Sequence, residues 1–134
     1  MEQTRETQEK QTVLTGAEWN VMECLWERAP RTGRETAERL SETVGWSRST
    51  ALTMLSRMEK KRLIGSREQE GKRVYFPLVE REDAAKRMTD DFLTRVYRGS
   101  VGAFLSAVTG EAALSEAEIA ELYAILDKVK EAGK

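Results

Sequence analysis

Residues 46–76 constrain the fold of this chain more than any other stretch. Residues 47–62 have the periodicity of an amphipathic helix, at about 100° per residue. Their apolar side chains share one face: Ala51, Met54, Leu55 and Met58. The opposite face has no acidic residue and carries hydroxyl and basic groups, from Ser49, Thr53, Ser56, Arg57 and Lys60. A helix with such a face can lie against phosphates and reach base edges in a major groove.

Two β-like runs follow this helix, at residues 63–68 and 73–78, and they are joined across residues 70–72. The alternation of Val74, Phe76 and Leu78 predicts that these side chains point inward. Pro77 suits an edge strand, because proline cannot donate to a sheet ladder. A helix followed by a basic-tipped hairpin is the order of recognition helix and wing in a winged helix-turn-helix. The predicted DNA-binding residues are Ser47, Arg48, Ser49, Thr50, Thr53, Ser56, Arg57, Lys60, Lys72 and Arg73.

Some of these side chains have an alternative role. Ser47 and Thr50 lie in the first turn, where they can contact phosphates, cap the helix, or do both. Arg57 can reach the DNA backbone, or it can pair with Glu59 or a neighbouring acidic residue. We assign base preference to Ser49 and Thr53, and phosphate contact to Arg48, Lys72 and Arg73.

The distribution of charge supports a nucleic-acid partner, although the net charge of the chain is −1. Residues 1–30 hold 3 basic and 6 acidic residues, a net of −3. Residues 31–73 hold 11 basic and 6 acidic residues, a net of +5, and residues 80–134 return to −3 with 8 basic and 11 acidic residues. Positive charge is therefore concentrated where the predicted recognition helix and wing lie. The alternative is a solvated charged surface without a partner.

Capping signals predict two further helices before the recognition helix. Thr15 and Glu18, and then Thr32 and Glu35, have the spacing of capping boxes. Pro30 ends the first helix, and Gly45-Trp46 forms the turn before the third, which Ser47 caps. We expect the buried sides to consist of Trp19, Met22 and Trp26 in the first helix, and of Ala37, Leu40 and Val44 in the second. Cys24 lies off the tryptophan face and is predicted to be a small buried or half-buried thiol. Residues 14–80 are thus predicted to form a winged-helix domain.

The pattern changes after residue 80, and residues 81–134 are predicted to form a helical dimerisation domain. Residues 81–98 form one helix, residues 104–108 a short apolar turn, and a capping box at Ser115 and Glu118 opens the last helix. Two such helices leave much apolar surface uncovered, which a partner chain covers most simply. The alternative is a helical hairpin packed back on the winged helix. The predicted dimer interface consists of Met88, Phe92, Val96, Leu105, Ile119, Leu122, Leu126 and Val129.

The residue inventory excludes several other classes of protein. The chain has no histidine and one cysteine, so imidazole chemistry, an internal disulfide and a histidine-dependent metal site are excluded, and we expect no cofactor and no enzyme activity. No apolar run has the length of a membrane span, and no signal peptide precedes the first helix. We therefore expect a cytoplasmic protein without membrane insertion. Residues 1–13 are polar and aperiodic, which predicts a disordered tail.

In these motifs the chain resembles the penicillinase-repressor family, the bacterial regulators of β-lactamase and methicillin-resistance genes. The resemblance covers residues 14–130 and depends on the order and spacing of four motifs. The motifs are residues 17–26 with Trp19 and Trp26, residues 46–61, the hairpin of residues 71–78, and residues 114–122. The resemblance implies an N-terminal winged helix and a C-terminal helical dimerisation domain. It also implies a homodimer that binds a palindromic operator and blocks transcription.

The chain departs from the family pattern at two places. Copper-responsive relatives carry paired cysteines near the C-terminus, and residues 127–134 hold none, so a metal site is not expected there. In antibiotic-responsive members a membrane sensor pathway triggers cleavage of an Asn–Phe bond in the dimerisation domain. The matching positions are Ala107 and Val108, which are the candidate cleavage site by position but do not reproduce that pair.

Taken together, the sequence predicts a homodimeric transcriptional repressor that binds double-stranded operator DNA. The resemblance extends this to control of β-lactamase or other resistance genes, and to inactivation by proteolysis through a membrane sensor protease. The alternative function is a winged helix that serves only as a protein-interaction module, which predicts no salt-dependent affinity for DNA.

Overall fold

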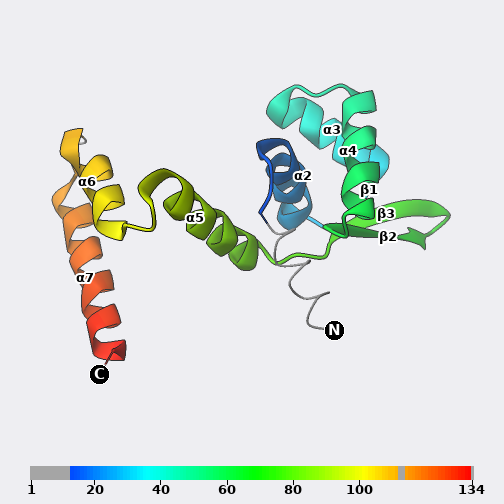
Figure 1. The fold of residues 1–134 in the computed structure, drawn as a ribbon. Coiled ribbons are helices and arrows are strands. Elements are labelled where there is room, and N and C mark those ends of the chain that lie inside the picture. Colours follow the sequence, from blue (N-terminus) through cyan, green and yellow to red (C-terminus); the bar gives the residue numbers. More distant parts are fainter. Residues whose placement is uncertain (1–12, 112–113, 134) are drawn as a thin grey trace. The chain divides into compact units, whose positions relative to one another are not determined.

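The structure is a computed structural model that describes residues 13–111 and 114–133. The chain forms two compact units that divide within helix α5 (Arg81–Tyr97), between Phe92 and Leu93 (Figure 1). This division falls later than the domain boundary predicted after residue 80, because Ala84 and Met88 pack with the first unit. The predicted disordered tail, apart from Val13, lies outside the described residues.

The first unit contains α2 (Gly16–Glu27), α3 (Gly33–Val44) and α4 (Arg48–Lys60), followed by the hairpin of β2 (Ile64–Gln69) and β3 (Lys72–Pro77). Helices α2 and α3 both begin at the predicted capping boxes. In the first box, the hydroxyl of Thr15 accepts from the backbone N–H of Glu18 at 3.1 Å, and the Glu18 carboxylate accepts from that of Thr15 at 2.9 Å. Each box satisfies two N–H groups that the helix leaves without a partner.

The sheet has three antiparallel strands in the order β1-β3-β2, and its first strand was not predicted. Strand β1 (Arg31–Thr32) has only two residues, too few for an alternating pattern. The prediction that Pro77 lies in an edge strand is wrong, because β3 is the central strand. However, β1 pairs only with Val74 and Tyr75. At Pro77 the edge of β3 that faces β1 therefore has no partner strand. The missing N–H therefore costs no ladder bond.

The core of the first unit lies between the helices and the base of the hairpin. Its largest fully buried side chains include Met22, Leu25, Leu40, Leu55, Met58, Leu63 and Ile64. Trp19 and Trp26 pack against this core and are partly buried. Two predicted core residues are wrong: Val44 at the end of α3 is 39% exposed, and Leu78, one residue past β3, is 54% exposed. Both lie at the end of an element, where neighbours cover only one side.

The second unit contains α6 (Val101–Glu111) and α7 (Glu116–Ala132), which starts at the predicted capping box of Ser115 and Glu118. The prediction of a short apolar turn at residues 104–108 is wrong, because these residues lie inside α6. A signal for this helix is present in the sequence: the hydroxyl of Ser100 accepts from the backbone N–H of Ala103 at 3.0 Å, as a capping residue does. Among the described residues, no helix is both long enough and apolar enough to cross a membrane.

Candidate nucleic-acid interface

Burial of one face fixes the rotation of helix α4. Ala51, Leu55 and Met58 are fully buried, and Met54 packs against the same core. The opposite face is therefore turned to solvent. All of the residues predicted there are exposed: Ser49, Thr53, Ser56, Arg57 and Lys60. The structure thus keeps hydroxyl and basic groups together on the open side of one helix.

The N-terminus of α4 is capped and free of acidic side chains. The hydroxyl of Ser47 accepts from the backbone N–H of Thr50 at 3.1 Å and donates to the Thr50 hydroxyl at 3.0 Å. Both side chains are therefore engaged in capping, which was one of their two expected roles, and both are exposed. Because the first turn holds Arg48 and no acid, the positive end of the helix dipole is not neutralised. This end of α4 suits an anion such as a phosphate.

The wing places its basic residues beside the hairpin turn. Glu70 and Gly71 both have positive φ, 52° and 77°, as the tight two-residue turns of β-hairpins require. Lys72 and Arg73 follow at once, and both are exposed. Arg73 lies 3.9 Å from Glu59 of α4, whose carboxylate also accepts from the hydroxyl of Ser66. Glu59, the alternative partner considered for Arg57, thus contacts the wing instead.

Arg67, on the first strand of the wing, was not among the predicted DNA-binding residues. Its guanidinium lies 5.4 Å from the centre of the Phe76 ring and donates to Gln69 at 3.1 Å. A cation over an aromatic face is held in place without losing its charge. Arg67 is exposed and adds to the positive charge of the wing. A sequence signal for Arg67 does exist. It is a basic residue in the first β-like run, and in the hairpin register it lies diagonally across from the aromatic Phe76 of the second run.

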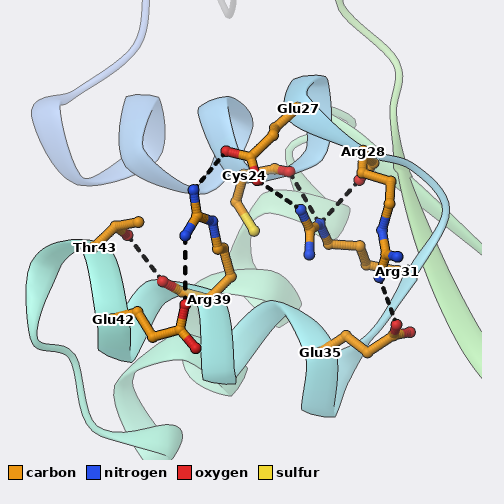
Figure 2. A network of polar contacts seen from close by, with 8 residues as sticks. All are labelled: Cys24, Glu27, Arg28, Arg31, Glu35, Arg39, Glu42 and Thr43. Carbon is orange, nitrogen blue, oxygen red and sulfur yellow. Dashed lines mark hydrogen bonds and ion pairs between the residues drawn. The ribbon is translucent and has the colours of Figure 1, made fainter.

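Not all of the positive charge in residues 31–73 lies on this surface. The Arg31 side chain is 9% exposed, and its Nε donates to the backbone oxygens of Cys24 and Arg28 at 3.2 and 3.0 Å (Figure 2). Its guanidinium also pairs with Glu27 at 3.1 Å, and Glu27 bonds Arg39 of α3 at 2.9 Å. The hydrogen bond from Arg39 holds the pKa of Glu27 below its ordinary value. Arg31 thus fixes the segment between α2 and α3, and it does not act as a surface cation.

Cys24 is a buried thiol at 5% exposure, as predicted. Burial raises the pKa of its thiol above the ordinary value, which keeps it protonated at neutral pH. In the part of the chain that the structure describes, no three His, Cys, Asp or Glu side chains are grouped so that they could hold a metal ion.

Much of the surface predicted as a dimer interface is exposed, mostly in the second unit, with Phe92 as the last residue of the first. Among the predicted residues, Phe92, Val96, Ile119, Leu126 and Val129 are between 41% and 64% exposed, while Leu105 and Leu122 are half-buried. Helix α7 has no fully buried residue. Tyr123 and Val101, which were not predicted to lie in the interface, are 66% and 55% exposed. Met88 is different, because it packs against the core of the first unit and so has a role within one chain.

The candidate cleavage site lies inside a helix. Ala107 and Val108 are both exposed, and Val108 is 44% exposed. However, their peptide bond belongs to α6 rather than to the expected turn. A protease that binds an extended segment therefore needs α6 to unwind locally first.

Three packed helices, a small three-stranded sheet whose hairpin forms the wing, and an exposed hydroxyl-rich and basic face on α4 define a winged-helix protein. A profile of the family described as penicillinase repressor matches residues 14–128, and the chain belongs to that family. It is 32% identical over 117 residues to the penicillinase repressor of Bacillus licheniformis, with 87% of this chain and 91% of that protein covered. It is 29% identical over 115 residues to the methicillin resistance regulatory protein MecI of Staphylococcus aureus, with 86% and 94% covered.

One solved structure is also similar, that of the monomeric Bacillus licheniformis BlaI in complex with the blaP half-operator. It is 31% identical, covers 52% of this chain and 85% of that chain, and has a TM-score of 0.48.

Proposed function

We propose that this chain is a transcriptional repressor that binds a palindromic operator as a homodimer. The observation that carries the proposal is the acid-free exposed face of α4, which lies in one compact unit with the basic wing. Membership of the penicillinase-repressor family supports it, as do relatives named as a penicillinase repressor and a methicillin resistance regulator.

Within this proposal α4 is the recognition helix and enters the major groove. Ser49 and Thr53 lie in the middle of its exposed face and read base edges, because short hydroxyl side chains can donate or accept there. Arg48, Lys72 and Arg73 contact phosphates, which position the protein on the duplex. The positive end of the helix dipole, at the capped N-terminus of α4, attracts the same DNA phosphates. Ser47, Thr50, Ser56, Arg57 and Lys60 complete the surface.

The second unit supplies the dimer contact. Helix α7 exposes several large apolar side chains, and a large exposed apolar surface is unfavourable in water. Their number supports the proposal that a second chain covers this face. A dimer holds two winged helices on one operator, so that binding of the first half raises the effective concentration of the second. The proposed interface in the second unit consists of Val96, Leu105, Ile119, Leu122, Leu126 and Val129, with Tyr123 added. Phe92, also predicted for the interface, is the last residue of the first unit.

Proteolysis within the second unit is the proposed route to release from DNA. Cleavage between Ala107 and Val108 would separate α7 from the rest of the chain and so remove the interface residues that α7 carries. The family resemblance suggests a membrane sensor protease as the trigger and β-lactamase or other resistance genes as targets. Because the bond lies in α6, we expect cleavage to depend on unwinding of this helix.

The test is a titration of the full chain with three duplexes: DNA upstream of its own gene, one half of any palindrome found there, and a scrambled sequence of the same length. We expect tight binding to the whole palindrome, weaker binding to the half-site and the weakest binding to the scramble. Equal affinity for all three would contradict a sequence-specific repressor, and no binding to any of them would favour the protein-interaction module.

A further inference from the structure

The first turns of α5 are attached to α2 by a cluster of two tryptophans and an arginine, all within the first unit. The rings of Trp19 and Trp26 meet edge to face, with centroids 5.1 Å apart and planes at 73°. The indole N–H of Trp26 donates to the backbone oxygen of Val79 at 2.9 Å. Val79 lies two residues before α5, so this bond fixes the place where the chain enters the helix.

Arg81, the first residue of α5, closes the cluster. Its guanidinium lies 5.6 Å from the Trp19 ring centre and 3.1 Å from the Glu23 carboxylate. The same Glu23 oxygen accepts from the indole N–H of Trp19 at 3.1 Å. One carboxylate thus holds the ring and the cation that lies over it. Because Glu23 and Arg81 are about half exposed, we expect their ion pair to contribute little to stability.

Two further residues of α5 continue the attachment along the helix. Ala84 is fully buried, and Met88 packs against the core of the winged helix. These two side chains lie one helical turn apart, on the same face of α5. The direction in which α5 leaves the first unit is therefore set by Val79, Arg81, Ala84 and Met88 together. Helix α5 then continues to Tyr97, past the point where the two units divide.

We propose that the cluster of Trp19, Glu23, Trp26 and Arg81, which we call the α5 clamp, is a positioning device for operator binding. This inference rests on the proposed function, because it assigns the clamp a role in presenting two half-sites. By fixing the exit of α5, the clamp limits the range of separations at which the two winged helices of a dimer meet DNA. Limiting that range raises the effective concentration at the second half-site and makes binding sensitive to half-site spacing.

The clamp itself touches none of the residues proposed to bind DNA. Loosening the clamp should therefore leave the affinity for a single half-site unchanged. It should reduce only the additional affinity that the second half-site provides. A cluster that served stability alone would behave differently. Its loss would lower the unfolding temperature and would leave the ratio of full-operator to half-operator affinity as it was.

The experiment compares the full-length wild type with Arg81→Ala, and with Lys86→Ala as the matched control. Lys86 lies on the same helix, is exposed and pairs only locally, with Asp90 at 3.5 Å, so its variant removes the same charge without touching α2. Each protein is titrated with the half-operator, the whole operator, and operators with one or two base pairs inserted between the halves. Sedimentation velocity and thermal unfolding are recorded alongside.

For Arg81→Ala we expect an unchanged dimer, half-operator affinity within about twofold of wild type, and whole-operator affinity lower by roughly tenfold. The penalty for inserted base pairs should be smaller than in wild type, because a loosened exit tolerates more spacings. Trp26→Phe, which removes the bond to Val79, should act in the same direction. Lys86→Ala should match the wild type in every titration.

An Arg81→Ala protein that keeps both the full gain from the second half-site and the wild-type spacing penalty would overturn the clamp while leaving the repressor intact. An equal loss on half and whole operators would also overturn it, because the residue would then act on DNA contact or folding. A wild type that shows no preference for operator over scrambled duplex would instead overturn the proposed function.

Discussion

The ammonium of Lys61 lies 2.7 Å from the carboxylate of Glu18 and joins the end of α4 to the start of α2. The Glu18 side chain is 6% exposed and also completes the capping box of α2, whereas Lys61 is 54% exposed. Lys61 therefore serves the fold and is engaged away from DNA, although it directly follows the proposed recognition helix. Burial raises the pKa of Glu18, but hydrogen bonds from Lys61 and Thr15 more than offset this, so its pKa is lowered overall.

Replacing Lys61 with methionine should destabilise the first unit by about 1 kcal/mol at neutral pH, because a nearly buried carboxylate loses its cationic partner while water still reaches the site. The measurement is urea unfolding followed by tryptophan fluorescence, since Trp19, Trp26 and Trp46 all lie in the first unit. Lys60→Met is the matched control, with its side chain on the exposed face of α4. Equal losses in the two variants would show that the ion pair contributes nothing.

The cost of Lys61→Met should depend on pH. A carboxyl whose folded pKa lies below its unfolded value stabilises the fold above the unfolded pKa, near 4.5, and this stabilisation is lost as pH falls through the folded pKa. The difference between wild type and Lys61→Met should therefore be full at pH 6–8 and shrink below roughly pH 4. A difference that stays constant from pH 7 to pH 3 would contradict the assignment to Glu18.

Gly65 in β2 lies directly against an aromatic ring of the paired strand. A Cβ there would lie 2.7 Å from two carbons of the Phe76 ring, so the ring, over which Arg67 lies, must move. We expect Gly65→Ala to cost about 1–2 kcal/mol in unfolding free energy. Gly102→Ala in α6 is the control, since its Cβ would meet only Ser100 Oγ at 3.8 Å. No loss in Gly65→Ala would mean that the ring and wing rearrange freely.

Base reading and phosphate contact should separate by mutation. Thr53→Ala should weaken binding to the operator more than binding to random duplex, because only base contacts distinguish the two. Lys72→Ala combined with Arg73→Ala should weaken both about equally. Competition titrations of each variant with operator and random DNA give the ratio directly. A changed ratio in the wing variant with an unchanged ratio in Thr53→Ala would reverse the assignment.

The dimer should depend on the apolar face of α7. Leu126 is 55% exposed in a single chain, so Leu126→Asp should leave the fold intact but place two carboxylates in a dimer interface. Because burying an unpaired charge is costly, we expect the dimer dissociation constant to rise by more than about tenfold. Sedimentation velocity measures this, with Ala124→Asp, which is exposed on the other side of α7, as control. A dimer as tight as wild type would place the interface elsewhere.

Local signals in the sequence were sufficient for much of the fold. The capping boxes at Thr15, Thr32 and Ser115 start their helices as predicted, because a cap and its N–H partner lie three residues apart. The hairpin predicted around Gly71 was also correct, and the boundaries of its two strands differ from the predicted ones by one residue. Strand β1 and helix α6 were missed. The first exists only through pairing with β3, and the second was hidden by the glycines around its start.

The candidate site was predictable where it depends on helical periodicity and unpredictable where it depends on distant partners. Every residue selected on α4 is exposed, because the opposite face carries the apolar residues. The fates of Arg31 and Lys61 could not be read in the same way. Lys61 pairs with a carboxylate 43 residues away, and Arg31 bonds backbone oxygens of the preceding helix end. Counting charge along the chain therefore overstated the charge available to DNA.

The salt dependence of DNA binding measures most directly whether the basic face of α4 and the wing bind phosphates. Operator affinity is measured from about 50 to 200 mM salt for the wild type, for Lys72→Ala with Arg73→Ala, and for Lys128→Ala with Lys130→Ala on α7. We expect a steep slope for the wild type and a slope shallower by roughly 3.6 in the wing variant, for four lost contacts per dimer. The α7 variant should keep the wild-type slope. A flat response in the wild type, or equal slopes in all three proteins, would show that the basic face of α4 and the wing do not bind phosphates.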